Sequence, residues 1–84
     1  MPLQRVTLYA RPDCHLCDEA RTELERLRAD GLDFELEEVD IESDESLLRR
    51  YLERIPVVEL NGQIVSELFL DAEGLRARLG TLSA

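Results

Sequence analysis

An α/β fold is predicted by three features of the amino-acid sequence. Short runs of apolar and β-branched residues alternate with segments whose apolar residues recur every three or four positions, as in strands and amphipathic helices respectively. The pair Asn61-Gly62 separates two apolar runs, and such a pair is a strong signal for a β-hairpin. No repeat, low-complexity tract or linker interrupts the 84 residues, so we expect a single domain over residues 1–84.

The first half of the chain predicts a strand, a helix and a second strand. Residues 3–9 (LQRVTLY) form an apolar, β-branched run that Arg11-Pro12-Asp13 ends, and residues 34–41 (FELEEVDI) alternate in part. Between them, a helix is expected from Cys14 to Asp30-Gly31. Its apolar face would consist of Leu16, Ala20, Leu24 and Leu27. Because a helix joins the two strands, we expect them to be parallel, with a right-handed crossover.

A second helix is predicted to follow the second strand. Ser43 is expected to cap it, with Asp44 and Glu45 in its first turn, where acidic side chains are favourable. Pro56 ends this helix, because proline cannot continue one. The apolar face of the helix would consist of Leu47, Leu48, Tyr51 and Leu52.

The last third of the chain predicts a hairpin and a third helix. Apolar residues on both sides of Asn61-Gly62 would form two antiparallel strands. Asp71 is expected to cap a helix that buries Leu75, Leu79 and Leu82. The whole order is strand, helix, strand, helix, strand, strand, helix, which predicts a four-stranded mixed sheet flanked by three helices.

Charge and composition exclude several classes of function. There are 19 acidic residues against ten basic ones, all of them arginine, and the net charge is −9. Without lysine there is no Schiff-base chemistry, and an acidic surface disfavours nucleic acid and anionic membranes. We also expect no membrane span and no secretion signal, because neither pattern occurs in the sequence. The missing signal and the small number of cysteines together indicate the reducing cytoplasm. We expect the protein to be a monomer.

The cysteine pair Cys14-His15-Leu16-Cys17 lies where the first strand gives way to the first helix. The unpaired N–H groups and the dipole of a helix N-terminus stabilise a thiolate there. A thiolate at Cys14 would attack a disulfide and form a mixed disulfide, which Cys17 would then resolve. A bridge between residues so close in sequence constrains little chain, so the pair is predicted to be redox-active, not structural.

The charged neighbours of the pair act in both directions. His15 and Arg11 are the nearest cations and would favour the thiolate of Cys14, whereas Asp13 and Asp18 would oppose it. Two alternatives give these residues no catalytic role: Asp13 caps the helix, and His15 only faces solvent.

Other interpretations of the pair are a metal site and a redox sensor without turnover. Two thiolates are half of a tetrahedral zinc site, and the chain has no second Cys or His pair, so we expect no resident metal. A c-type haem needs His directly after the second cysteine, where Asp18 stands. Iron–sulfur handling by a dimer, with glutathione as a further ligand, stays open.

These residues resemble those of the glutaredoxins in the thioredoxin-fold superfamily, and most of all short bacterial glutaredoxin-like proteins. The resemblance covers the whole chain and lies in Tyr9–Ala20 (YARPDCHLCDEA), Val39-Asp40-Ile41 and Arg54-Ile55-Pro56-Val57. It implies a thioredoxin-like fold, with Cys14 as the nucleophile and Cys17 as the resolving thiol.

The resemblance also implies a substrate site. Pro56 matches a cis-proline beside the cysteines, and the backbone of Ile55 would pair with an extended substrate or with glutathione. Arg11 matches a basic residue that helps to hold a carboxylate of glutathione, and Arg49, Arg50 and Arg54 are further candidates for that role. The implied partners are disulfide-containing proteins or glutathione, and the implied reductant is glutathione.

The sequence departs from the glutaredoxin pattern in two places. His15-Leu16 stands between the cysteines, where glutaredoxins usually have Pro-Tyr. After the hairpin, glutaredoxins have a glycine pair and an Asp that receives the γ-glutamyl end of glutathione. Here residues 64–71 (IVSELFLD) contain no glycine, and Glu67 adds negative charge. Dithiol exchange is compatible with these changes, whereas specificity for glutathione is not supported by them.

Overall fold

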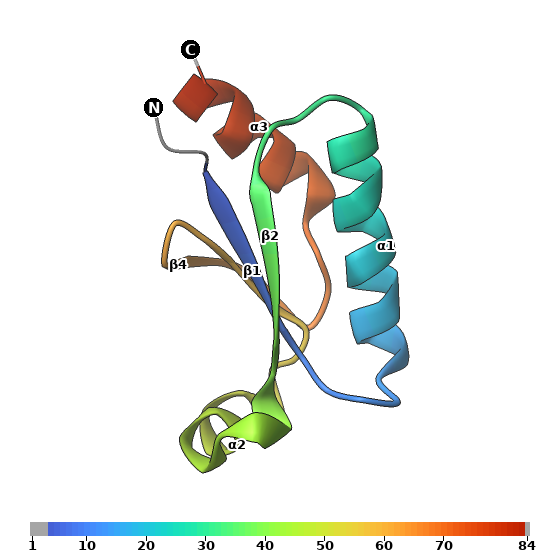
Figure 1. Ribbon diagram of the computed structural model, residues 1–84, viewed down its shortest axis with the longest axis vertical. Helices are drawn as coiled ribbons and strands as arrows, with labels where there is room; N and C mark the ends of the chain where they lie inside the picture. The colour runs from blue at the N-terminus through green and yellow to red at the C-terminus, as the bar shows by residue number, and fades with distance from the viewer. Residues whose placement is uncertain (1–3, 84) are drawn as a thin grey trace.

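The computed structural model describes the chain over residues 4–83, and its side chains over residues 4–79. Its elements follow the predicted order (Figure 1). They are β1 (Arg5–Ala10), α1 (His15–Ala29), β2 (Glu35–Asp40), a 3₁₀ turn (Ile41–Ser43), α2 (Glu45–Tyr51), β3 (Val57–Leu60), β4 (Gln63–Glu67) and α3 (Ala72–Ser83).

A four-stranded mixed sheet forms the centre of the molecule, in the order β2-β1-β3-β4. β1 runs parallel to β2 and antiparallel to β3, and β3 and β4 form the hairpin. Both predictions of strand direction are therefore confirmed. Because β1 is a central strand with its inward side chains fully buried, it fixes the positions of the loops that leave its C-terminal end.

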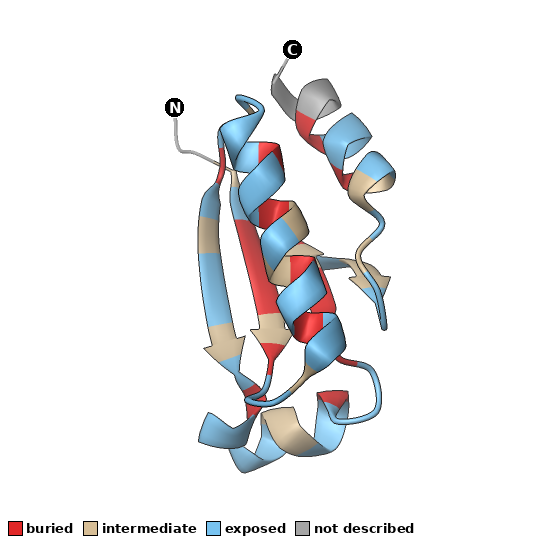
Figure 2. Cartoon of the chain, turned by 90° about the vertical axis from the view of Figure 1, so that its right-hand side faces the viewer, coloured by how far each residue is buried: buried red, intermediate tan, exposed pale blue. Residues whose placement is uncertain are grey.

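One face of the sheet is covered by α1 and α3, whereas α2 lies at the end where β1 and β2 finish (Figures 1 and 2). Apolar side chains from α1 and α3 pack on the sheet and make one continuous core. Its largest fully buried members include Leu8, Leu24, Leu27, Ile41, Leu75 and Leu79. Burying each such side chain contributes about 1.5–3 kcal/mol to folding.

The buried face of α1 differs from the predicted one. The helix buries Cys17, Ala20, Leu24 and Leu27, while Leu16 is 48% exposed. The prediction for Leu16 was wrong because residues 17, 20, 24 and 27 follow alternate spacings of three and four, which keep one stripe facing the sheet. Leu16 precedes that stripe by one position, which is a rotation of about 100°.

The start of α2 is one residue later than predicted. Ser43 belongs to the 3₁₀ turn, and its hydroxyl donates to the Asp40 carbonyl (2.6 Å). Asp44 is the cap, because its Oδ1 accepts from the Ser46 N–H (2.8 Å). The hydroxyl and the N–H of Ser46 both hold the pKa of Asp44 below its usual range.

The predicted apolar face of α2 is only partly buried. Tyr51 is buried and Leu47 and Leu48 are half-buried, but Leu52, which follows the last turn, is 43% exposed. Leu52 was therefore wrongly assigned to the core, since the helix ends before it.

The hairpin and α3 agree with the sequence. Asn61 and Gly62 both have positive φ (52° and 89°), as the two central residues of a tight hairpin turn require. Asp71 caps α3 by accepting from the Gly74 N–H (3.0 Å), and Leu75 and Leu79 are buried. The predicted burial of Leu82 falls outside the described side chains. Within residues 4–83, no helix combines the length and apolarity that crossing a bilayer requires.

Candidate redox site around Cys14 and Cys17

The two cysteines lie at the junction of β1 and α1. Cys14 is the N-cap of α1, and Cys17 lies in the first turn. Their sulfurs are bonded as a disulfide, with the Cα atoms 5.2 Å apart. The spacing of three residues therefore brings the two sulfurs together within one helical turn, as the sequence predicts.

The two sulfurs differ in their access to solvent. Cys17 is completely buried on the inner face of α1, whereas Cys14 is half-buried and lies at the edge of the core. The N–H of Cys17 donates to the Sγ of Cys14 (3.2 Å), so the cap position directs an unpaired helix N–H at this sulfur. Such a donor, together with the helix dipole, stabilises negative charge on Cys14.

The cations predicted to assist Cys14 have acidic partners of their own. The Arg11 Nε lies 3.4 Å from a carboxylate oxygen of Glu42. The side chain of His15 is 89% exposed, and its Nε2 lies 3.0 Å from a carboxylate oxygen of Glu19, one turn along the helix. This geometry supports the solvent-facing interpretation of His15 and weakens the electrostatic role of Arg11.

Asp13 does not cap α1, so that interpretation was wrong. The cap is the next residue, Cys14, and Asp13 instead adopts a left-handed backbone conformation (φ 60°) in the turn before it. Aspartate tolerates this conformation better than most residues do.

Pro56 lies beside the end of β1 from which the cysteine loop departs. In the antiparallel pair β1–β3, Val57 lies opposite Tyr9. Pro56, the residue before Val57, therefore lies at the level of Ala10. The Ile55–Pro56 bond is cis, as the resemblance implies. The Ile55 N–H donates to the Tyr51 carbonyl (3.0 Å), so a substrate that paired with this N–H would have to displace that carbonyl.

The segment after β4 lies next to the loop that leads into Pro56, and no motif in the sequence predicts this contact. The Leu68 N–H donates to the Arg54 carbonyl (2.9 Å), which ties this segment to the loop before Pro56. Leu68 has a left-handed φ of 70°, and both Leu68 and Phe69 project into solvent. One signal of this unusual segment was available in the sequence, namely the absence of the glycine pair that glutaredoxins have there. Leu68 has a positive φ, which glycine adopts without cost.

The remaining arginines named by the resemblance are scattered. Arg49 pairs with Glu45 along the exposed face of α2 (2.7 Å), and Arg50 lies over the ring of Tyr51. Arg54 lies beyond the end of α2, so the expectation that it shares this helix with Arg49 and Arg50 was wrong; its Nε is 3.9 Å from a carboxylate oxygen of Glu67. These contacts support solvated surface roles for the arginines of α2.

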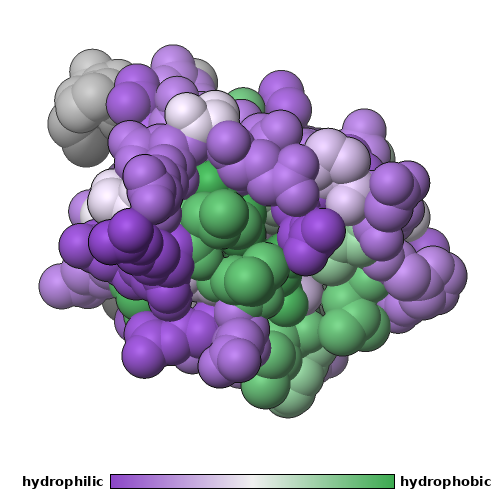
Figure 3. Space-filling model, turned by 90° about the horizontal axis from the view of Figure 1, so that it is seen from below, coloured by the Kyte–Doolittle hydropathy of each residue, from purple (hydrophilic) through white to green (hydrophobic). Residues whose placement is uncertain are grey.

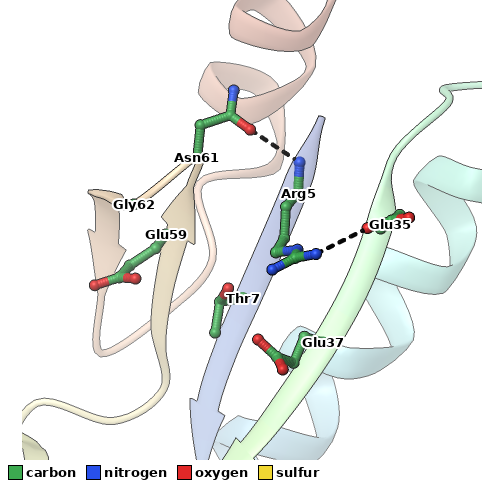
Figure 4. A pocket seen from close by; sticks show the side chains of 7 residues that line it. All are labelled: Arg5, Thr7, Glu35, Glu37, Glu59, Asn61 and Gly62. Atoms are coloured by element: carbon green, nitrogen blue, oxygen red, sulfur yellow. Dashed lines mark hydrogen bonds and ion pairs between the residues drawn. The ribbon is translucent and has the colours of Figure 1, made fainter. Parts of the chain in front are cut away.

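A separate hollow of about 600 Å³ lies over the face of the sheet opposite α1 (Figure 4). It is lined by charged and polar residues of β1, β2, β3 and the hairpin turn, and contains none of the predicted site residues. Its lining residues are Arg5, Thr7, Glu35, Glu37, Glu59, Asn61 and Gly62. Among the described residues, no group of three or more His, Cys, Asp or Glu side chains is arranged to hold a metal ion.

Comparison with known proteins assigns the chain to a family. The model of the glutaredoxin-like domain family (DUF836) matches residues 5–80. No functionally curated protein matches the chain.

Two solved structures share substantial sequence with the chain. The solution structure of protein Ne2328 from Nitrosomonas europaea is 31% identical, covers 93% of each chain and superposes with a TM-score of 0.78. The structure of target protein XcR50 from X. campestris is 38% identical over 90% of this chain and 96% of its own, with a TM-score of 0.72.

A thioredoxin from Halobacterium salinarum, in a mutant form, shares the fold. It is 20% identical over 96% of this chain and 75% of its own, with a TM-score of 0.68. The predicted thioredoxin-like fold is thereby confirmed. The family match over nearly the whole described chain and the two structures of more than 30% identity show that the protein belongs to the glutaredoxin-like domain family.

Proposed function

We propose that the protein is a thiol–disulfide oxidoreductase that works as a monomer on the disulfides of proteins or of small thiols. The observation that carries this proposal is the unequal placement of the two sulfurs. Cys14 is accessible and caps a helix, whereas Cys17 is buried and lies within bonding distance of it. An attacking thiolate needs access and stabilisation, and a resolving thiol needs only proximity.

The reaction takes two exchange steps. The Cys14 thiolate attacks one sulfur of a substrate disulfide, forms a mixed disulfide and releases the other sulfur as a thiolate. Cys17, on losing its proton, attacks Cys14 and releases the remaining substrate thiolate, which leaves the Cys14–Cys17 disulfide. Substrate gains two electrons, the protein loses two, and glutathione or another thiol restores the dithiol. No resident cofactor is needed.

Pro56 and Ile55 contribute to the proposal by their position. They lie at the level of the cysteine loop, where they would support an extended substrate across the Cys14 sulfur. Arg11 would hold a substrate carboxylate only by exchanging its partner Glu42.

The roles of the two cysteines are tested by trapping. The variant Cys17→Ser, incubated with a disulfide substrate, should accumulate a mixed disulfide at Cys14, because the resolving step is lost. Its matched control, Cys14→Ser, should form no adduct at Cys17, which is buried. Intact mass after acid quenching measures both. Equal adduct formation in the two variants would contradict the assignment of roles.

A further inference from the structure

Bulky apolar side chains are exposed around the cysteine motif. Leu16 is 48% exposed, Leu68 51% and Phe69 69%. Leu16 and Phe69 line one small hollow of about 110 Å³, together with Ala20 and Leu70. Seen from below, the molecule shows an apolar area that extends from its centre to its lower right edge, with hydrophilic residues on the other sides (Figure 3). We call Leu16, Leu68 and Phe69 the apolar rim.

The apolar rim is held in place by the backbone. The hydrogen bond from the Leu68 N–H to the Arg54 carbonyl fixes the segment after β4 against the loop that leads into Pro56. Leu16 is fixed from the other side, since it lies between the two cysteines in the first turn of α1. The rim therefore joins the site of disulfide exchange directly and is formed before any substrate binds.

The charge around the rim selects among possible substrates. Glu19 and Glu23 line the same hollow as Leu16 and Phe69, and Glu67 precedes Leu68 in the chain. Each has one cationic neighbour, respectively His15, Arg26 and Arg54, so the excess of negative charge comes from the protein as a whole. The whole protein carries a net charge of −9. Glutathione has two carboxylates and one ammonium group, so this surface repels it, whereas a basic peptide is attracted.

We propose that the apolar rim is a docking surface for a bulky apolar side chain next to the cysteine of a basic peptide disulfide. The rim thereby directs the enzyme to peptide and protein disulfides and away from glutathione disulfides. This inference rests on the proposed function, because the rim acts through the reaction of Cys14. Partial burial of one aromatic side chain there favours its substrate about tenfold.

Three chromogenic probes test the proposal. Each is a mixed disulfide with thionitrobenzoate: one of the capped peptide Arg-Cys-Phe, one of the capped peptide Arg-Cys-Ser, and one of glutathione. Reduced protein reacts with each in two steps, giving thionitrobenzoate, the free peptide or glutathione thiol, and oxidised protein. Release of coloured thionitrobenzoate reports the rate constant of the attack.

The expected order of rate constants is the Phe peptide first, about tenfold ahead of the Ser peptide, with glutathione slowest. The variants Phe69→Ser and Leu16→Ser should each lower the Phe-to-Ser ratio several-fold. Ile64→Ser is the matched control, because Ile64 is 44% exposed but lies toward the hairpin turn, opposite Glu59, and should keep the ratio. Far-UV circular dichroism establishes that each variant is folded.

The outcomes separate the two proposals. If the wild-type protein reacts with all three probes at similar rates, or fastest with glutathione, the docking surface is refuted and the oxidoreductase function stands. If it releases no thionitrobenzoate from any probe, the proposed function fails as well. A ratio that is high but unchanged in both rim variants would also refute the role of the rim.

Discussion

Cys14 and Cys17 show how one turn of helix gives two identical side chains different chemistry. The N-cap position leaves the Cys14 sulfur at the edge of the core, where it accepts a hydrogen bond from the backbone N–H of Cys17. Three residues later the helix has turned toward the sheet, and Cys17 joins the buried stripe of α1. The roles proposed for the two thiols follow from this difference in burial.

Leu68 has a backbone conformation that is favourable for glycine and unfavourable for leucine. Its left-handed backbone (φ 70°) costs a β-carbon-bearing residue about 1–2 kcal/mol, which glycine avoids. Leu52 is exposed to a similar extent but has an ordinary helical backbone (φ −51°). Leu68→Gly should therefore leave a free energy of unfolding roughly 1–2 kcal/mol above that of Leu52→Gly. Urea denaturation of the oxidised variants measures the difference, and equal values would contradict it.

Tyr9 gives the fold a dependence on alkaline pH. Burial first, and then the Glu59 carboxylate that accepts its hydroxyl hydrogen bond (3.2 Å), raise the pKa of Tyr9 above the usual 10.0. Since the unfolded chain then loses this proton first, stability should fall as pH rises from about 10 through the folded pKa.

The variant Tyr9→Phe isolates this effect, because it removes the titrating group and keeps the ring that packs on Tyr51. Denaturant midpoints of the oxidised protein between about pH 9 and pH 11 should decline more steeply for the wild type than for this variant. Parallel declines would show that Tyr9 does not couple to folding.

Among the elements, strands and long helices were predictable because their signals are local. The alternation in residues 5–10, the helical period of α1 and the Asn61-Gly62 turn all specify structure within a few residues. The errors lie at element ends. Leu16 lies in the first turn of α1, one position before the buried stripe, and Leu52 follows the last turn of α2, so both are exposed although their spacing fits an apolar face.

The cap of α2 is testable as an element boundary. Asp44→Ala should lower the melting temperature more than Ser43→Ala does, because Asp44 holds the first turn and Ser43 belongs to the preceding 3₁₀ turn. The pKa of Asp44 lies below its usual 3.8, so its stabilising effect is present above that value and is lost as pH falls through the folded pKa.

Acidification therefore provides the control for this cap. The difference in melting temperature between the wild type and Asp44→Asn should shrink as the carboxylate becomes protonated. If Ser43→Ala lowered the melting temperature more than Asp44→Ala, Ser43 would be the cap of α2, as the sequence alone predicts.

At the scale of the whole molecule, the sheet topology assembles a site from three distant segments. The parallel pairing of β1 with β2 and the antiparallel pairing with β3 bring the cysteine loop, Pro56 and the segment around Leu68 to one end. The sequence predicted the cysteine pair from its local motif and Pro56 by resemblance. It could not reveal the apolar rim, because that surface depends on Leu16 and Phe69, which are far apart in the sequence, lining one hollow in the folded protein.

The measurement that tests the central claim most directly is a redox titration of the purified protein. The protein is equilibrated in glutathione buffers of varied ratio, quenched with acid and weighed intact, with Cys14→Ser as the control. We predict a reversible loss of two hydrogens in the wild type, few glutathione adducts, and no such transition in the variant. A wild-type protein that keeps its dithiol mass at every ratio would contradict the proposed redox function.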